Sequence, residues 1–151
     1  MRLARTVVIA AAGILSGLAW NALSGRGIAL DANAFILPGE DVVEIQAAEA
    51  KVKLDQGALF LDARPTDFYS MSHIPGALSL PENDFDRAFT ALEPGLRTRF
   101  DIVVYCSGFG CEASHIVARK LRDRGVPAAV LHDGIPAWED ARYPLKKGPQ
   151  P

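Results

Sequence analysis

A short apolar run that ends at a cysteine constrains the fold of this chain more than any other stretch. Residues 102–105 read Ile-Val-Val-Tyr, which is typical of a buried strand, and Cys106 follows directly. Two glycines lie in the next five residues, and apolar side chains then recur from Ala113 at the spacing of one helix face. The stretch therefore predicts a cysteine at the carboxyl end of a strand, where open α/β sheets bind their ligands.

Candidate strands and helices alternate along the rest of the chain. Strands are expected over residues 42–45, 58–62, briefly within 73–80, and over 101–105 and 128–131. Helices are expected over 47–54, 66–71, from 81–84 to about 92, over 113–124 and from 134 onward. This alternation predicts the α/β class, with a parallel sheet and helices on both of its faces.

The first 25 residues are predicted to be a membrane segment. Arg2 and Arg5 precede an uncharged stretch from residue 6 to 25, close to the ~20 residues that span a bilayer. A signal anchor and a cleaved signal peptide both stay open. We expect a linker over 26–40, a domain over 41–147 and a tail over 148–151. The positive-inside rule places the domain outside the cytoplasm, which is the periplasm in a bacterium. If the N-terminal segment is cleaved, we expect a soluble domain that is periplasmic or secreted.

Charge and cysteine content exclude several classes of protein. The net charge is −2 without a basic patch, so no nucleic-acid partner is expected. The basic residues within 119–124 are interpreted as a solvated helix face. Two cysteines are too few for a disulfide scaffold, and no zinc-ligand spacing occurs, so neither a metal nor another cofactor is expected.

Four ordered motifs resemble the rhodanese (sulfurtransferase) domain. They cover residues 61–64, 73–81, 103–106 and 133–138, and the resemblance extends over roughly 42–145. It implies a three-layer domain with a five-stranded parallel sheet flanked by helices. It also implies that Cys106 takes a sulfane sulfur from a small donor such as thiosulfate, forms a persulfide and passes the sulfur to a thiol or cyanide. A protein sulfur acceptor is a further expected partner.

The residues of the predicted loop suit this chemistry. A thiolate at Cys106 is favoured by the helix N-terminus that follows it. The backbone N–H groups after it are expected to bind the substrate, and the residues concerned are Ser107, Gly108, Phe109, Gly110, Cys111 and Glu112. Arg64 follows another predicted strand, and two interpretations stay open: an anion contact near the loop, or an ion pair with Asp62.

The loop departs from the family pattern at three positions. Ser107 and Glu112 stand where many rhodanese loops have basic residues, so thiosulfate, a dianion, should bind less well than a less charged donor or a protein persulfide. Cys111 is either a resolving thiol or a small side chain facing inward. Two alternatives to sulfur transfer therefore remain: a redox or sensing protein that uses both cysteines, and a non-catalytic binding module.

Overall fold

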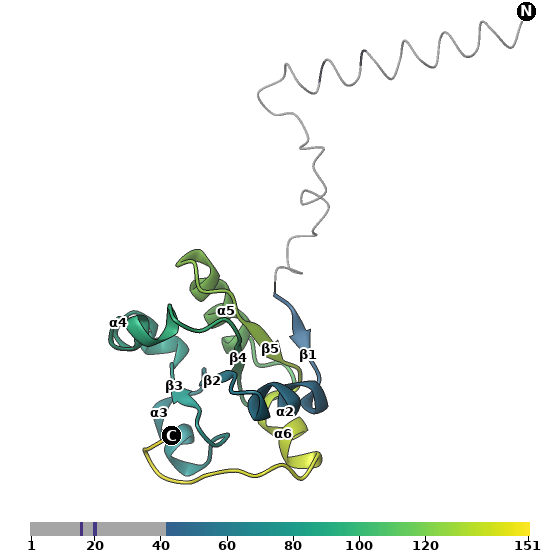
Figure 1. Ribbon diagram of the computed structural model, residues 1–151, viewed down its shortest axis with the longest axis vertical. Helices are drawn as coiled ribbons and strands as arrows, with labels where there is room; N and C mark the ends of the chain where they lie inside the picture. Colours follow the sequence, from purple (N-terminus) through teal and green to yellow (C-terminus); the bar gives the residue numbers. More distant parts are fainter. Residues whose placement is uncertain (1–15, 17–19, 21–41) are drawn as a thin grey trace, which may run out of the picture. The chain divides into compact units, whose positions relative to one another are not determined.

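The computed structural model describes residues 16, 20 and 42–151 (Figure 1). The chain divides into two compact units, Met1–Pro38 and Gly39–Pro151, and the second contains the elements described below. Apart from Ser16 and Trp20, the predicted membrane segment and linker lie outside the described residues. Both stay predictions. Within the described part of the chain, no helix has the length and apolar character needed to cross a bilayer.

Five parallel strands form one sheet, as predicted. They are β1 (Glu44–Ile45), β2 (Leu59–Asp62), β3 (Leu78–Ser79), β4 (Ile102–Tyr105) and β5 (Ala129–Leu131). Their order across the sheet is β1-β5-β4-β2-β3, so β4 is central. Val103 of β4 lies opposite Phe60 of β2 on one side and Ala129 of β5 on the other. All strands point the same way, so their carboxyl ends share one edge of the sheet.

Helices cover both faces of the sheet (Figure 1). They are α2 (Ala47–Asp55), α3 (Thr66–Met71), α4 (Phe85–Leu96), α5 (Ala113–Asp123) and α6 (Gly134–Asp140), with a short 3-10 helix over Glu82–Asp84. Residues of α4 and α5 pack into one core, and residues of α2 and α6 pack into the other. This three-layer α/β architecture confirms the predicted fold class.

The central strand contributes alternate side chains to the two cores. Ile102 and Val104 lie in the core beneath α4 and α5, whereas Val103 and Tyr105 lie in the core beneath α2 and α6. All four side chains are buried. A strand that is covered on both faces has no solvent-facing side, and this explains the unbroken apolar run in the sequence.

Helix α4 is longer than predicted. It continues to Leu96, four residues past the expected end, although Pro94 and Gly95 lie in its last turn. Proline removes a helical hydrogen bond, so the sequence predicts an earlier end. Leu96 is only 1% exposed and packs in the core with Phe89 and Leu121. Burial of this side chain offsets the lost bond.

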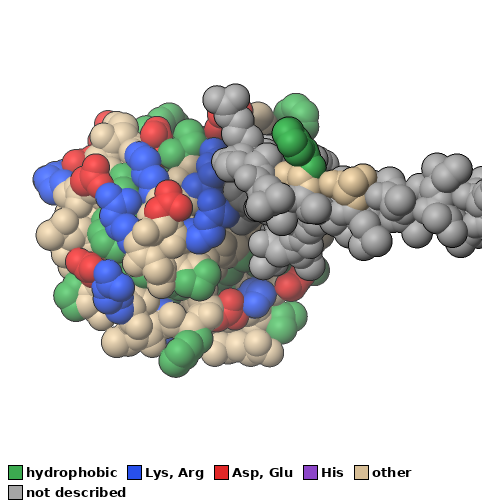
Figure 2. Space-filling model, turned by 90° about the horizontal axis from the view of Figure 1, so that it is seen from above, with side chains coloured by type: hydrophobic (Ala, Val, Ile, Leu, Met, Phe, Trp, Pro, Cys, Tyr) green, Lys and Arg blue, Asp and Glu red, His purple; other side chains and the backbone are tan. Residues whose placement is uncertain are grey.

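The basic residues in α5 and at its C-terminal cap form part of a charge-balanced surface. Lys120 lies 3.8 Å from Glu82, and Arg124 forms an ion pair with Asp86 of α4. The Arg124 guanidinium also lies 4.7 Å from the centre of the Phe85 ring. Figure 2 shows Lys and Arg side chains interspersed with Asp and Glu on one face of the molecule. This mixture agrees with the interpretation of the cluster as a solvated helix face.

Trp138 of α6 anchors the core beneath α2 and α6. Its side chain is fully buried, its ring packs edge-on against Phe60, and its Nε1–H donates to the carbonyl of Pro144 at 2.9 Å. We expect Trp138→Ala to lower the free energy of unfolding by about 3–5 kcal/mol. Phe100→Ala is the control, because this side chain is fully exposed and should change stability by less than about 0.5 kcal/mol. Chemical denaturation of the full chain measures both; equal effects would contradict the described packing.

Candidate active site

Cys106 lies directly after β4 and is held there by the start of α6. Its side chain is 3% exposed, and its carbonyl accepts a hydrogen bond from the Ile135 N–H at 3.0 Å. A Cβ at Gly134 would lie 2.2 Å from the Cys106 oxygen, and the φ of Gly134 is +54°. Only glycine fits this approach and this backbone conformation. The first turn of α6 therefore fixes the backbone of the cysteine.

A buried ion pair supports the strand end beside Cys106. Arg64 Nη2 donates to Asp62 Oδ2 at 2.6 Å and to the carbonyl of Ser72 at 2.5 Å. Burial lowers the pKa of Arg64, but the hydrogen bond and the charge of Asp62 outweigh it and raise that pKa. The guanidinium lies 5.7 Å from the centre of the Tyr105 ring. Of the two interpretations of Arg64, the ion pair with Asp62 is the one that the structure contains.

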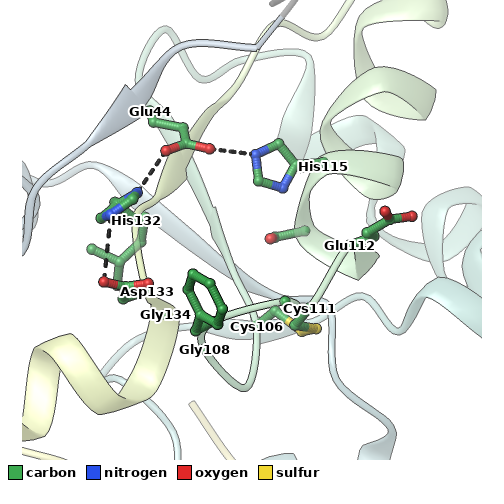
Figure 3. A pocket seen from close by; sticks show the side chains of 13 residues that line it. Glu44, Cys106, Gly108, Cys111, Glu112, His115, His132, Asp133 and Gly134 are labelled. Atoms are coloured by element: carbon green, nitrogen blue, oxygen red, sulfur yellow. Dashed lines mark hydrogen bonds and ion pairs between the residues drawn. A yellow bond between two sulfur atoms is a disulfide. The ribbon is translucent and has the colours of Figure 1, made fainter. Parts of the chain in front are cut away.

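A cavity of about 230 Å³ opens beside Cys106 (Figure 3). The predicted loop contributes Cys106, Gly108, Phe109, Gly110, Cys111 and Glu112 to its lining. Ser107 and Arg64 are not among the lining residues. Ser107 is exposed, with its Oγ 3.8 Å from the Cys106 Sγ. Phe109, at the tip of the loop, is 98% exposed.

Most backbone N–H groups of the loop have no acceptor in the part of the chain that the structure describes. The Cys111 N–H donates to the carbonyl of Gly108 at 3.0 Å. Among the described residues, no backbone carbonyl accepts from the other N–H groups between residues 107 and 112. Gly108 and Gly110 have φ values of +123° and +75°, which turn the chain sharply. Unpaired donors in such a turn, at the start of α5, suit an anion.

Cys111 is joined to Cys106 by a disulfide bond (Figure 3). Their Cα atoms lie 6.3 Å apart, inside the usual range of about 4.4–6.8 Å. The sequence left two interpretations of Cys111 open: a small inward-facing side chain, or a resolving thiol that can bond to Cys106. The structure contains the bond between the two cysteines that the second interpretation requires.

Sequence reasoning missed a carboxylate between two histidines in the lining of the cavity. Glu44 of β1 lies 2.6 Å from His115 Nε2 through one oxygen and 2.6 Å from His132 Nδ1 through the other. His132 Nε2 lies 3.4 Å from Asp133. All four residues line the cavity (Figure 3). They come from β1, α5 and the turn after β5, so the parallel sheet brings them together.

The contacts of Glu44 shift its pKa and that of His132 in opposite directions. Hydrogen bonds from His132 and His115 lower the pKa of Glu44 from its ordinary 4.5. The hydrogen bond to Glu44, with the charge of Asp133, raises the pKa of His132 from 6.5. The contacts of the Glu44 carboxylate contribute to the stability of the fold above pH 4.5, and this contribution is lost as the pH falls through the lowered pKa of Glu44. The contact of the protonated His132 ring contributes below pH 6.5, and this contribution is lost as the pH rises through the raised pKa of His132.

Carboxylates are the charged side chains that line the cavity together with the two histidines. Glu44, Glu112 and Asp133 line it, and no lysine or arginine is among its described lining residues. In the described part of the chain, no group of three or more His, Cys, Asp or Glu side chains is arranged for a metal ion. The groups that the site offers are a disulfide that yields two thiols on reduction, backbone N–H donors and a His–Glu–His cluster.

The protein is a parallel α/β domain with a cysteine-containing loop at the carboxyl end of its central strand. The model of the rhodanese-like domain matches residues 46–141, more than half of the 151-residue chain. The chain belongs to the rhodanese-like domain family, as its motifs predict.

Known proteins of several kinds are similar to this chain. The HTH-type transcriptional regulator Rv0324 of Mycobacterium tuberculosis is 34% identical over 105 residues, which are 69% of this chain and 45% of that protein. The chain thus spans less than half of this relative. A thiosulfate sulfurtransferase from Pseudomonas aeruginosa is 29% identical with a TM-score of 0.61, over 72% of this chain and 21% of that one. The rhodanese-like domain of Alr3790 from Anabaena is 27% identical with a TM-score of 0.58, and the match covers 70% of this chain and 80% of that domain's chain.

The His–Glu–His cluster gives a pH prediction. We expect Glu44→Gln to lower the pKa of His132 toward its ordinary value, because the largest cause of the rise is its hydrogen bond to the carboxylate. Glu49→Gln is the control, since Glu49 on α2 makes no hydrogen bond to either histidine in the described structure. NMR titration of the His132 ring in the full chain measures the shift. An unchanged pKa in Glu44→Gln would contradict the described contact.

Proposed function

We propose that the protein is a sulfurtransferase that carries a sulfane sulfur as a persulfide on Cys106 when its disulfide is reduced. The observation that carries this proposal is the position of Cys106. It lies at the carboxyl end of the central strand, in the lining of a cavity, and is followed by loop N–H groups that have no backbone acceptor among the described residues. The rhodanese-like family and the similar thiosulfate sulfurtransferase support this activity.

The transfer needs two displacements at sulfur. The Cys106 thiolate attacks the sulfane sulfur of the donor, and the remainder of the donor leaves with the bonding electron pair. The loop N–H groups between residues 107 and 112 are suited to hold the persulfide anion that results. An acceptor thiolate or cyanide then attacks the outer sulfur and returns Cys106 as a thiolate.

The proposed donor carries little negative charge. The carboxylates of Glu44, Glu112 and Asp133 line the cavity, and its described lining residues include no lysine or arginine. A thiosulfate dianion would approach three carboxylates, of which Glu44 alone is bonded to two histidines. A low-molecular-weight persulfide or a protein persulfide avoids much of this repulsion. The acceptor is proposed to be a thiol.

A thiol–disulfide redox protein is the second candidate function. The Cys106–Cys111 bond favours it, because both cysteines of the chain are joined in the described state. In this case, oxidation and reduction of the bond would be the whole activity, and Cys106 would not take up sulfur.

Mass spectrometry of the reduced full chain separates the two candidates. We expect Cys111→Ser, which holds no disulfide partner for Cys106, to gain one sulfur atom on Cys106 after treatment with glutathione persulfide. Cys106→Ser should gain none at its loop. Peptide mapping identifies the modified residue. If Cys111→Ser never gains sulfur from any donor while the wild-type chain cycles between dithiol and disulfide, the redox function replaces sulfur transfer.

The charge of the cavity should determine the preferred donor. We expect Glu112→Arg to raise kcat/KM for thiosulfate by about fivefold, because reversing a charge beside the anion contributes about 1 kcal/mol, and the gain should shrink at high salt. Glu49→Arg makes the same change of charge on α2, outside the lining of this cavity, and should have little effect. Steady-state assays with thiosulfate measure both. Equal rates for the two variants would contradict the proposed role of the carboxylates.

A further inference from the structure

Both cysteine sulfur atoms lie in one loop, where they are bonded to each other. The Cys106–Cys111 Cα atoms are 6.3 Å apart, and the hydrogen bond from the Cys111 N–H to the Gly108 carbonyl closes the turn between them. The second cysteine is therefore placed by the backbone, and no movement of a helix or strand is needed for the bond. Helix α5 begins two residues later, at Ala113.

The loop is packed against α6 on its inner side. A Cβ at Gly108 would lie 2.8 Å from the Pro136 ring and 3.3 Å from the Asp133 carbonyl. Together with the bond from Ile135 to the Cys106 carbonyl, this contact holds the base of the loop. These contacts do not depend on the disulfide, so we expect them to keep Cys111 near Cys106, at a high effective concentration, when the bond is open.

We propose that Cys111 is a resolving cysteine, which converts the Cys106 persulfide into the disulfide and releases hydrogen sulfide. This inference rests on the proposed sulfur transfer to Cys106. It adds an activity that needs no separate sulfur acceptor. The product is free sulfide in place of a new persulfide.

The proposed step balances in atoms and electrons. The Cys111 sulfur attacks the Cys106 Sγ, a bond forms between the two Sγ atoms, and the bond from Cys106 Sγ to the outer sulfur breaks. The outer sulfur leaves with the electron pair and takes the Cys111 thiol proton, so it departs as hydrosulfide. The sulfane sulfur is reduced by two electrons, and the two cysteines are oxidised to a disulfide.

The structure favours attack at the inner sulfur. Attack at the outer sulfur would move the persulfide to Cys111 and leave both cysteines unjoined. The bond that the loop contains instead joins the Sγ atoms of Cys106 and Cys111 themselves. Loop geometry that closes this bond is the geometry that expels the outer sulfur.

A dithiol reductant completes the cycle. Cys111 is half-buried, whereas Cys106 is 3% exposed, so an external dithiol reaches the Cys111 sulfur more easily. Its attack there forms a mixed disulfide with Cys111 and expels the Cys106 thiolate. The second thiol of the reductant then frees Cys111 and leaves as the cyclic disulfide. The net reaction of a thiosulfonate and a dithiol gives a sulfinate, hydrogen sulfide and the oxidised dithiol.

A single-turnover experiment on the full chain tests this inference. The reduced protein, freed of reductant, is treated with benzenethiosulfonate, because neither this donor nor its sulfinate product is a thiol that could release sulfide. We expect the wild-type chain to release about one sulfide per chain and to end with the Cys106–Cys111 disulfide. Cys111→Ser and Cys111→Ala should keep the sulfur atom on Cys106 and release sulfide only at background level.

The outcomes separate this inference from the function on which it rests. A wild-type chain that keeps its persulfide, with Cys111 open to alkylation by iodoacetamide, would overturn the resolving role and leave sulfur transfer intact. If neither Cys111 variant takes up sulfur while both show the wild-type circular dichroism spectrum, the proposed sulfur transfer itself fails. Addition of dithiothreitol to the wild-type chain should turn the single release into continuous sulfide production.

Discussion

The site depends on the contact between the backbone of Cys106 and the first turn of α6. The Cys106 carbonyl accepts from the Ile135 N–H, and it lies so near Gly134 that no side chain fits there. Because β4 is buried on both faces, its end cannot shift to relieve a larger residue. The loop therefore leaves the sheet from a fixed point, and its glycine turns then decide where Cys111 and the loop N–H groups lie.

Much of the fold follows from local patterns in the sequence. The four apolar residues of β4 are typical of a strand buried on both faces, and Gly125 with Pro127 ends α5 close to the expected residue. The end of α4 does not follow from such patterns. Pro94 and Gly95 favour an earlier end, and the burial of Leu96 that continues the helix is a tertiary contact. Local propensity gives no sign of it.

The candidate site was predictable where it is continuous in sequence. Cys106 and Cys111 belong to one loop, so their proximity follows from spacing, although the bond between them depends on the turn at Gly108. Glu44 is separated from His115 by 71 positions and from His132 by 88, so only the sheet order joins them. A signal did exist: parallel strands end at one edge, and His132 directly follows β5. The strand that contains Glu44 was predicted, but its pairing with β5, which brings Glu44 next to His132, was not.

The position of Glu44 has a practical consequence for work on isolated fragments. The family match begins at residue 46 and ends at 141, whereas Glu44 lies before it and Lys146, which pairs with His73, lies after it. A fragment trimmed to the family boundaries would keep both cysteines but lose the edge strand β1 and the carboxylate between the two imidazoles. Assays on such a fragment would therefore describe a cavity that has lost one of its three carboxylates and the partner of both histidines.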